Sequence, residues 1–253
     1  MLLKMTDLKA INVDARDGAV GSIEDALFDD ERWVIRYLVV NTRARVGGRK
    51  VLISPLAIER FDPGEQKLHL ILTQKAVDES PPIEAHLPVS RAMEEEINRY
   101  YGFPNYWAFG ASGPIWGWGT VPVLPAEPLP EPPPQEERDA DPDAHLRSAA
   151  EVRGYHIKAI DQTFGHLEDL VFDTNDWAIR YLLLDTRNWW PGSPVIVRPN
   201  WAREIDWASR TISMDIDAEQ IRSSPRYDAG STLTREYEEA LHQHYERTPY
   251  WLE

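Results

Sequence analysis

The sequence predicts a mainly β protein with α-helices, organised as two tandem small β-barrels that are each followed by a C-terminal helix. One strand-like stretch occurs twice, as RWVIRYLVVNTR in Arg32–Arg43 and as DWAIRYLLLDTR in Asp176–Arg187. The offset of 144 residues between the copies holds without a gap over roughly 100 residues. Short apolar, β-branched segments separated by turn residues fill each copy, which is typical of a barrel or sandwich. A chain of 253 residues has room for two such domains.

The repeat divides the chain into three parts. Residues 1–107 form a first small barrel with its helix, and residues 151–253 form a second. Residues 108–150 are a linker that holds nine of the 20 prolines and then an acidic run over Glu136–Asp143. This composition favours extended polyproline II backbone and forms no packed core. Duplicated units usually keep an ancestral self-interface, so we expect a monomer with an approximate two-fold axis, or a homodimer.

The elements of the first unit follow one another at short intervals after a lead-in over Met1–Lys9. Segments rich in β-branched and aromatic residues alternate with turn residues, and each such segment is expected to be a strand. The expected strands of the first unit are Val20–Asp29, Arg32–Arg43, Val51–Pro55, Ile58–Phe61 and Lys67–Leu72. Their counterparts lie 144 residues later in the second unit. Both faces of the repeated strand are mostly apolar, which is typical of a strand covered on two sides.

Each unit is expected to end in a helix. Ser90 and Thr234 are equivalent N-caps, and the acidic residues after them suit the positive end of a helix. Apolar residues then recur at i, i+4 and i+8, as one stripe that packs on a partner surface. The stripe residues are Met93, Ile97 and Tyr101 in one helix and Tyr237, Leu241 and Tyr245 in the other.

One arginine in each repeated strand, Arg36 or Arg180, interrupts the apolar pattern. An unpaired charge between two covered faces is costly, so we expect each arginine to pair with a repeated carboxylate. The candidates are Glu24, Asp25 and Asp29 for Arg36, and Glu168, Asp169 and Asp173 for Arg180. The alternative is that each arginine extends to solvent.

Aromatic pairs close both repeats, as Tyr106-Trp107 and Tyr250-Trp251, and Trp116 and Trp118 follow the first pair in the linker. Burying a tryptophan removes a large apolar area from water and can anchor a segment without regular structure. We therefore expect these aromatic residues to dock against the helix and the barrel. The alternative is that they stand exposed as a patch that binds a partner.

The composition restricts the kinds of function. The formal net charge is -15, so the chain lacks the basic footprint that a generic nucleic-acid binder needs. The chain has no cysteine, which excludes disulfides and thiolate chemistry. This suits a cytoplasmic protein, although a bacterial envelope protein can also lack cysteine. No apolar run reaches the length of a membrane span, so we expect no transmembrane segment.

No pattern of catalytic or metal-binding type is present in the sequence. It has no phosphate-binding P-loop, no nucleophile elbow and no zinc-binding HExxH motif. His242 and His244 are two apart on an expected helix and so point in different directions. The recurring Glu-Asp pairs occupy neighbouring strand positions, whose side chains point to opposite faces. We therefore predict no catalytic residue, no metal ligand and no cofactor, and a protein that is not an enzyme.

The order of the repeated motifs resembles that of the PRC-barrel family. In both units G-x-[IL]-E-D-x-x-F-D precedes W-x-I-R-Y-L, an Asn/Asp-Thr-Arg step, V-x-[IV]-x-P and a helix that ends in Tyr-Trp. The family includes the cytoplasmic barrel of the photosynthetic reaction centre H subunit, and the bacterial ribosome maturation factor has a related barrel. The second unit is more similar to stand-alone bacterial members, through Trp189–Gly192 and Ser224–Asp228. The first unit departs from them at Arg45–Gly47 and Pro82–Glu84.

The resemblance implies the barrel fold for both units, but a fold does not fix a role. Three classes of function follow. We predict a non-enzymatic scaffold or adaptor that binds a protein partner or modulates a larger assembly. The ribosome maturation factor suggests an accessory factor in ribosome assembly or RNA processing, although the acidic charge counts against direct RNA contact. The third class is a small-molecule sensor or hydrolase with a site between the barrels.

Overall fold

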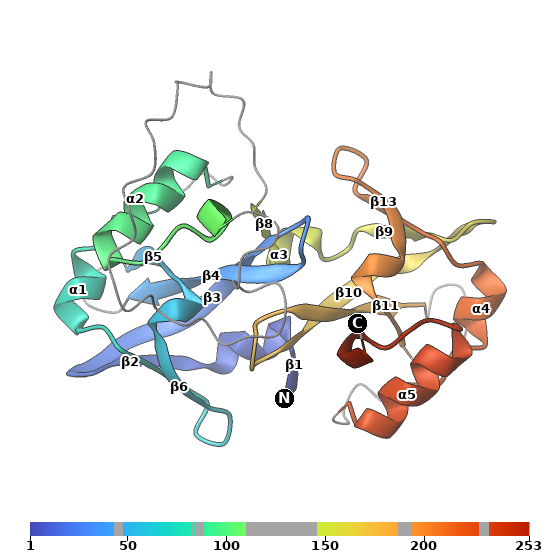
Figure 1. Cartoon of the computed structure of the whole chain (residues 1–253), viewed down its shortest axis with the longest axis horizontal. Helices are drawn as coiled ribbons and strands as arrows, with labels where there is room; N and C mark the ends of the chain where they lie inside the picture. The colour runs from blue at the N-terminus through green and yellow to red at the C-terminus, as the bar shows by residue number, and fades with distance from the viewer. Residues whose placement is uncertain are drawn as a thin grey trace. The chain divides into compact units, whose positions relative to one another are not determined.

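The computed structural model describes residues 1–42, 48–81, 83, 89–109, 146–186, 194–227 and 233–252 (Figure 1). It is mainly β with helices, as predicted, and contains two seven-stranded sheets. No helix in these ranges is both long enough and apolar enough to cross a bilayer.

The chain divides into two compact units. Unit 1 consists of Met1, Met5–Ala150 and Asp173–Ala178, whereas unit 2 consists of Leu2–Lys4, Glu151–Phe172 and Ile179–Glu253. Each unit therefore contains a short piece of chain taken from outside its own repeat.

The sheet of unit 1 has the strand order β5-β4-β3-β2-β7-β6, and β8 pairs with β3. Neighbouring strands are antiparallel except β2 and β7, which are parallel. The end strands β5 and β6 are joined by the one-turn helix η2 (Pro55–Ala57), so the described pairing is an open path. The strands are β2 (Asn12–Ala15), β3 (Gly18–Asp29), β4 (Val34–Thr42), β5 (Arg49–Ile53), β6 (Ile58–Asp62), β7 (Lys67–Leu70) and β8 (Leu146–Ser148).

The sheet of unit 2 repeats this order as β12-β11-β10-β9-β14-β13, with β1 paired to β10. Along this path β14 and β9 are parallel, and the other neighbouring strands are antiparallel. The strands are β1 (Leu2–Lys4), β9 (His156–Lys158), β10 (Thr163–Asp173), β11 (Ile179–Asp185), β12 (Val195–Val197), β13 (Ala202–Asp206) and β14 (Thr211–Met214).

The predicted helices α2 (Arg91–Tyr101) and α5 (Arg235–His244) begin at the expected N-caps. The Ser90 hydroxyl accepts from the Met93 amide, and the Thr234 hydroxyl accepts from the Tyr237 amide. In unit 1, α2 packs Ile97 into a core with Leu27, Tyr37 and Leu52. The other helical segments are η1 (Met5–Ala10), α1 (Gln74–Asp78), η3 (Tyr106–Phe109), α3 (Ala149–Val152), η4 (Pro199–Trp201), α4 (Ala218–Arg222) and η5 (Tyr250–Leu252).

The two units exchange equivalent strands. β1 and β8 lie 144 residues apart, so they occupy the same position in the repeat. The sequence interpretation placed the first in the lead-in and the second in the linker. In the structure β1 belongs to unit 2 and β8 belongs to unit 1. Strands of three residues carry no periodicity that could reveal this from sequence.

Leu146 provides a test of the exchange. It is buried in the core of unit 1 next to Leu27 and Val39, although it follows the linker in sequence. Leu146→Ala is expected to lower the free energy of unfolding of unit 1 by about 2–3 kcal/mol, the lower part of the range for such a truncation. Hydrogen exchange should show lost protection in β3 and β4, with β10 and β11 unchanged. Leu2→Ala, at the equivalent position, should affect β10 and β11 instead, and the reverse pattern would contradict the exchange.

A repeated glycine allows the long β3 and β10 strands to approach their neighbours closely. A Cβ on Gly21 would lie 1.9 Å from the Asn41 carbonyl oxygen, and one on Gly165 would lie 2.2 Å from the Asp185 carbonyl oxygen. Backbone atoms cannot move aside as a flexible side chain can. These positions therefore require glycine for close approach.

Gly21→Ala is expected to destabilise unit 1 by about 1–3 kcal/mol, because β3 and β4 must separate to admit the methyl group. Gly64→Ala is the matched control, since its Cβ would meet only the Asp62 carboxylate at 3.5 Å. The control should change stability by no more than about 0.5 kcal/mol. Urea denaturation followed by hydrogen exchange measures both, and equal effects would refute the close-approach explanation.

Candidate functional site

The side chain of Arg36 is buried in strand β4 and pairs with Asp29 at the end of β3. Its Nη2 lies 2.9 Å from Asp29 Oδ2, and its Nε also donates to that oxygen. Asp29 Oδ1 accepts from the amides of Glu31 and Arg32, so the same carboxylate closes the turn into β4. The prediction that Arg36 pairs with a repeated carboxylate is confirmed.

The other two candidates for Arg36 have different partners. Asp25 accepts from the Ser148 hydroxyl and from the Ala150 amide, and so it holds β8 in the sheet. Glu24 pairs with Lys50 at the surface. Of the three candidates, Asp29 is therefore the carboxylate that pairs with Arg36.

In unit 2, the guanidinium carbon of Arg180 lies 4.2 Å from the centre of the Tyr250 ring. Asp173 accepts from the Asn175 amide and from the Met1 ammonium group. Asp169 accepts from the amide of Leu170, and Glu168 is half-buried in β10. The carboxylate partner of Arg180 stays a prediction.

The first aromatic pair is docked rather than exposed. Tyr106 is 5 % exposed, and its ring centre lies 3.9 Å from the guanidinium carbon of Arg36. Its hydroxyl accepts from Arg91 Nη1 at 2.6 Å. Arg91 also lies 4.4 Å from the ring of half-buried Trp107. A guanidinium at such distances from an aromatic face is attracted by the ring quadrupole.

The second pair repeats this arrangement. The centre of the Trp251 ring lies 3.7 Å from the guanidinium carbon of Arg235, which is the counterpart of the contact between Trp107 and Arg91. The Tyr250 hydroxyl donates to Glu238 at 3.1 Å. Burial raises the pKa of Tyr250 to about 12, so this hydroxyl stays protonated and remains a donor. Tyr106 is buried, whereas Tyr250 and Trp251 are half-buried, and both pairs contact arginines of the helix and of the repeated strand. Trp116 and Trp118 lie outside the described residues, as do Trp189–Gly192, Asp228, Arg45–Gly47, Pro82 and Glu84.

We call each group of docked residues an aromatic clamp. The clamp of unit 1 is Arg36, Arg91, Glu94, Tyr106 and Trp107, and the clamp of unit 2 is Arg180, Arg235, Glu238, Tyr250 and Trp251. The two clamps are related by the offset of 144 residues. Each one ties the segment after the helix to the strand that carries the repeated arginine.

The helix carboxylates of the clamps differ in how fully they are bonded. Glu238 Oε1 accepts from the hydroxyls of Tyr181 and Tyr250, and its Oε2 lies 3.3 Å from Arg235. Glu94 Oε1 lies 3.3 Å from Arg91, whereas its Oε2 is buried with no hydrogen-bond partner among the described residues. Burial raises the pKa of Glu94 to about 7, because the charged form loses its hydration there.

Neighbours of the clamps also differ between the units. The buried Tyr37 hydroxyl donates to Asn98 in unit 1, whereas His242 occupies that helix position in unit 2. His242 lies edge-on to Trp201 and Trp251, with ring centres 5.6 and 5.4 Å away. His244 instead points to the Gln220 carbonyl. Among the described residues, no group of three or more His, Cys, Asp or Glu is placed to hold a metal ion.

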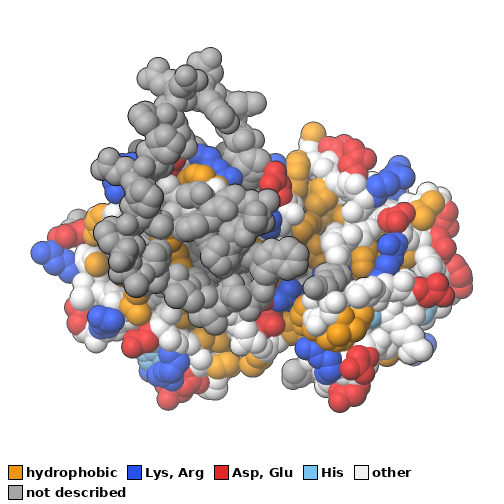
Figure 2. All heavy atoms as spheres, in the orientation of Figure 1, with side chains coloured by type: hydrophobic (Ala, Val, Ile, Leu, Met, Phe, Trp, Pro, Cys, Tyr) orange, Lys and Arg blue, Asp and Glu red, His pale blue; other side chains and the backbone are white. Residues whose placement is uncertain are grey.

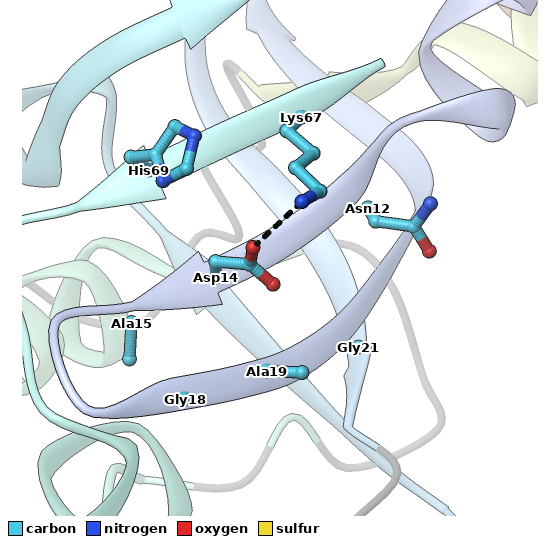
Figure 3. Close-up of a pocket in the computed structure, with 8 residues that line it drawn as sticks. All are labelled: Asn12, Asp14, Ala15, Gly18, Ala19, Gly21, Lys67 and His69. Atoms are coloured by element: carbon cyan, nitrogen blue, oxygen red, sulfur yellow. Dashed lines mark ion pairs between the residues drawn. The ribbon is translucent and has the colours of Figure 1, made fainter. Parts of the chain in front are cut away.

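A cavity of about 520 Å³ opens on the outer side of β2, β3 and β7 in unit 1. Figure 3 shows Asp14 on β2 pointing toward Lys67 on β7, and the cavity is also lined by Asn12 on β2, His69 on β7 and small residues of β3. Lys67 Nζ lies 3.8 Å from Asp14 Oδ2. His69 Nε2 is buried and has no hydrogen-bond partner among the described residues.

Sequence reasoning did not identify the helix residues of the clamps. Glu94 and Glu238 were considered only among the acidic residues that suit the start of a helix, and Arg91 and Arg235 were not considered. The pattern R-x-x-E could have indicated them, because it occurs once in each helix at the repeat offset. In both copies its glutamate lies twelve residues before the tyrosine of the Tyr-Trp pair. The cavity residues left no such signal, because their counterparts in unit 2 differ in charge.

No model of a protein family matches the chain, and no curated protein is detectably similar to it.

Proposed function

We propose that each unit is a PRC-barrel-like domain. The repeated motifs support this, as does the strand path that both units share, followed by a capped helix. In this proposal the two ends of each path, joined by a single turn of helix, close the sheet into a small barrel.

We infer that the chain is a non-enzymatic scaffold or adaptor that binds a protein partner. The observation that carries this inference is the aromatic clamp, in which the repeated charged and aromatic residues bind one another inside each unit. Side chains used in this way stabilise the domain, and recognition then falls to the outer surface. The net charge of -15 favours a partner with a basic surface. On the face drawn in Figure 2, acidic side chains occur at several places among basic ones.

Capture with the full chain, followed by reconstitution from purified components, tests the scaffold function. We expect one protein that binds saturably, with an on-rate that falls as the salt concentration rises. Cross-links mapped by mass spectrometry should fall on exposed residues such as Glu96 and Glu239 rather than on the clamps. Charge reversal at the mapped residues should abolish binding, whereas Tyr106→Phe should not. Recovery of RNA or ribosomal particles in place of a protein would favour the accessory-factor alternative.

The cavity of unit 1 supports a second candidate, a sensor of a small polar molecule. Its volume lies in the usual range of ligand sites, and its lining residues include a carboxylate, an ammonium group, an amide and an imidazole ring. Those groups suit a small zwitterion. Titration with the common amino acids, followed by NMR, tests it. His69→Ser, which installs the residue of the equivalent position 213, should abolish any binding, and an unchanged spectrum of the parent protein would exclude this candidate.

A further inference from the structure

We propose that the aromatic clamp of unit 1 is a pH-sensitive contact, in which ionisation of Glu94 loosens the Tyr106–Trp107 segment from the sheet. This goes beyond the proposed scaffold function and does not depend on it. The clamp of unit 2, which has the same architecture, lacks the feature that makes the first one sensitive.

Only one of the two carboxylate oxygens of Glu94, Oε1, has a polar partner among the described residues. The side chain is 1 % exposed, and its buried Oε2 has no hydrogen-bond partner among the described residues. A neutral carboxyl group tolerates this more easily than a carboxylate, because an unpaired charge in a dry site costs much more than an unpaired neutral group. The titratable and charged groups that face Glu94 are Arg91 on α2, Tyr106 on η3, Arg36 and Tyr37 on β4, and Asp29 on β3.

The equivalent carboxylate in unit 2 has contacts on both oxygens. Glu238 accepts from Tyr181 at 2.8 Å and from Tyr250 at 3.1 Å, and it lies beside Arg235. In unit 1 the corresponding Tyr37 hydroxyl donates to Asn98 instead. Asn98 and His242 occupy the same helix position, and only in unit 2 does the neighbouring tyrosine hydroxyl donate to the helix carboxylate.

Arg91 connects the charge of Glu94 to the docked aromatic residues. Its Nη1 lies 3.3 Å from Glu94 Oε1 and 2.6 Å from the Tyr106 hydroxyl, and its guanidinium lies over Trp107. When Glu94 ionises, its carboxylate competes more strongly for this cation and for water. Both effects weaken the contacts of Arg91 with Tyr106 and Trp107.

The direction of the pH effect follows from linkage. The pKa of Glu94 in the closed clamp is about 7, because burial disfavours the carboxylate, and an opened clamp returns it to the ordinary value near 4.3. The closed clamp therefore binds more protons between these values. Its stability is complete at low pH and decreases as the pH rises toward 7 and somewhat beyond. From pH 6 to pH 8 the opening equilibrium should increase about tenfold.

Hydrogen exchange of the full chain, corrected for the intrinsic pH dependence, tests the proposal at residues 103–107. We expect protection there to fall about tenfold between pH 6 and pH 8 in the parent protein, and by less than about twofold in Glu94→Gln. Glu96→Gln, on the exposed side of the same helix, should keep the full response. An equal fall in the parent and in Glu94→Gln would overturn the proposal.

Fluorotryptophan NMR provides a second measurement that needs no variant at Glu94. The Trp107 resonance, assigned with Trp107→Phe, should move with a midpoint near pH 7. Tyr106→Phe removes a hydroxyl that stabilises the charged carboxylate, so it should shift the midpoint upward. A Trp107 resonance that stays constant from pH 5.5 to pH 8.5 would contradict the pH-sensitive clamp.

Discussion

Replacing Arg36 with alanine is expected to lower the free energy of unfolding of unit 1 by about 3–5 kcal/mol, the usual loss when one member of a buried ion pair is removed. Arg36 and Asp29 are 1 % and 4 % exposed, so the variant leaves a carboxylate buried without this cation. It also removes the guanidinium that lies 3.9 Å from the centre of the Tyr106 ring. Hydrogen exchange of the amides in β3 and β4 measures the loss within unit 1.

Two further variants distinguish the effect of burial on stability from the effect of removing a charge. Arg60→Ala removes an exposed pair of similar length, in which Arg60 lies 2.8 Å from Asp62, and is expected to cost about 0–1 kcal/mol. Combining Arg36→Met with Asp29→Asn removes both charges together, so its cost should be smaller than the sum of the two single losses. A loss below about 1 kcal/mol for Arg36→Ala would mean that the pair contributes no more than a surface pair does.

The repeated strand shows what sequence could establish here. An arginine between two apolar faces required a carboxylate, and three acidic residues were available on the preceding strand. The alternation of side chains between the two faces of a strand could not identify the partner among these three residues. The reason is that the register of β3 against β4 is irregular between Ile23 and Asp25 and again between Leu27 and Phe28. Each bulge changes which face the next side chain occupies. Asp29 is the partner because it lies beyond both irregularities and also closes the turn.

The elements that sequence reasoning missed are short. Helices α1 and α4 have five residues each, too few to show an amphipathic period, although Thr73 and Asp217 cap them in the usual way. The exchanged strands β1 and β8 have three residues each, and nothing local indicates which sheet they join. By contrast, the long helices were predictable, because each has a recognisable N-cap residue and an apolar stripe that extends over about three turns.

The docking of the aromatic ends was predictable because the Tyr-Trp pair occurs in both repeats. The residues that hold each pair in place were not predictable. A Tyr-Trp pair at the same place in both repeats indicated an internal role. That role depends on two arginines from different elements, one on β4 and one at the first turn of α2, which meet only when the chain is folded. Sequence spacing alone does not place a strand residue beside a helix residue.

Tyr106→Ala is expected to destabilise unit 1 by about 3–5 kcal/mol, in the range for truncating a buried aromatic side chain. The ring is 5 % exposed, packs with Val34 and Trp107, and lies beside both clamp arginines. Tyr106→Phe keeps the ring but removes the hydroxyl that accepts from Arg91, so it should cost only about 1–2 kcal/mol. Loss of hydrogen-exchange protection in β4 and α2 measures both variants.

Tyr100→Ala is the matched control for the aromatic ring. Tyr100 lies on the same helix but is 40 % exposed, and its hydroxyl makes one hydrogen bond to the Ala76 carbonyl. Its loss should therefore cost about 1 kcal/mol. If the aromatic end were instead a partner-binding patch, Tyr106→Ala would leave stability unchanged and weaken only the capture of a partner. An internal clamp requires that Tyr106→Ala lowers the free energy of unfolding most. Tyr106→Phe and Tyr100→Ala should each lower it by a smaller and similar amount.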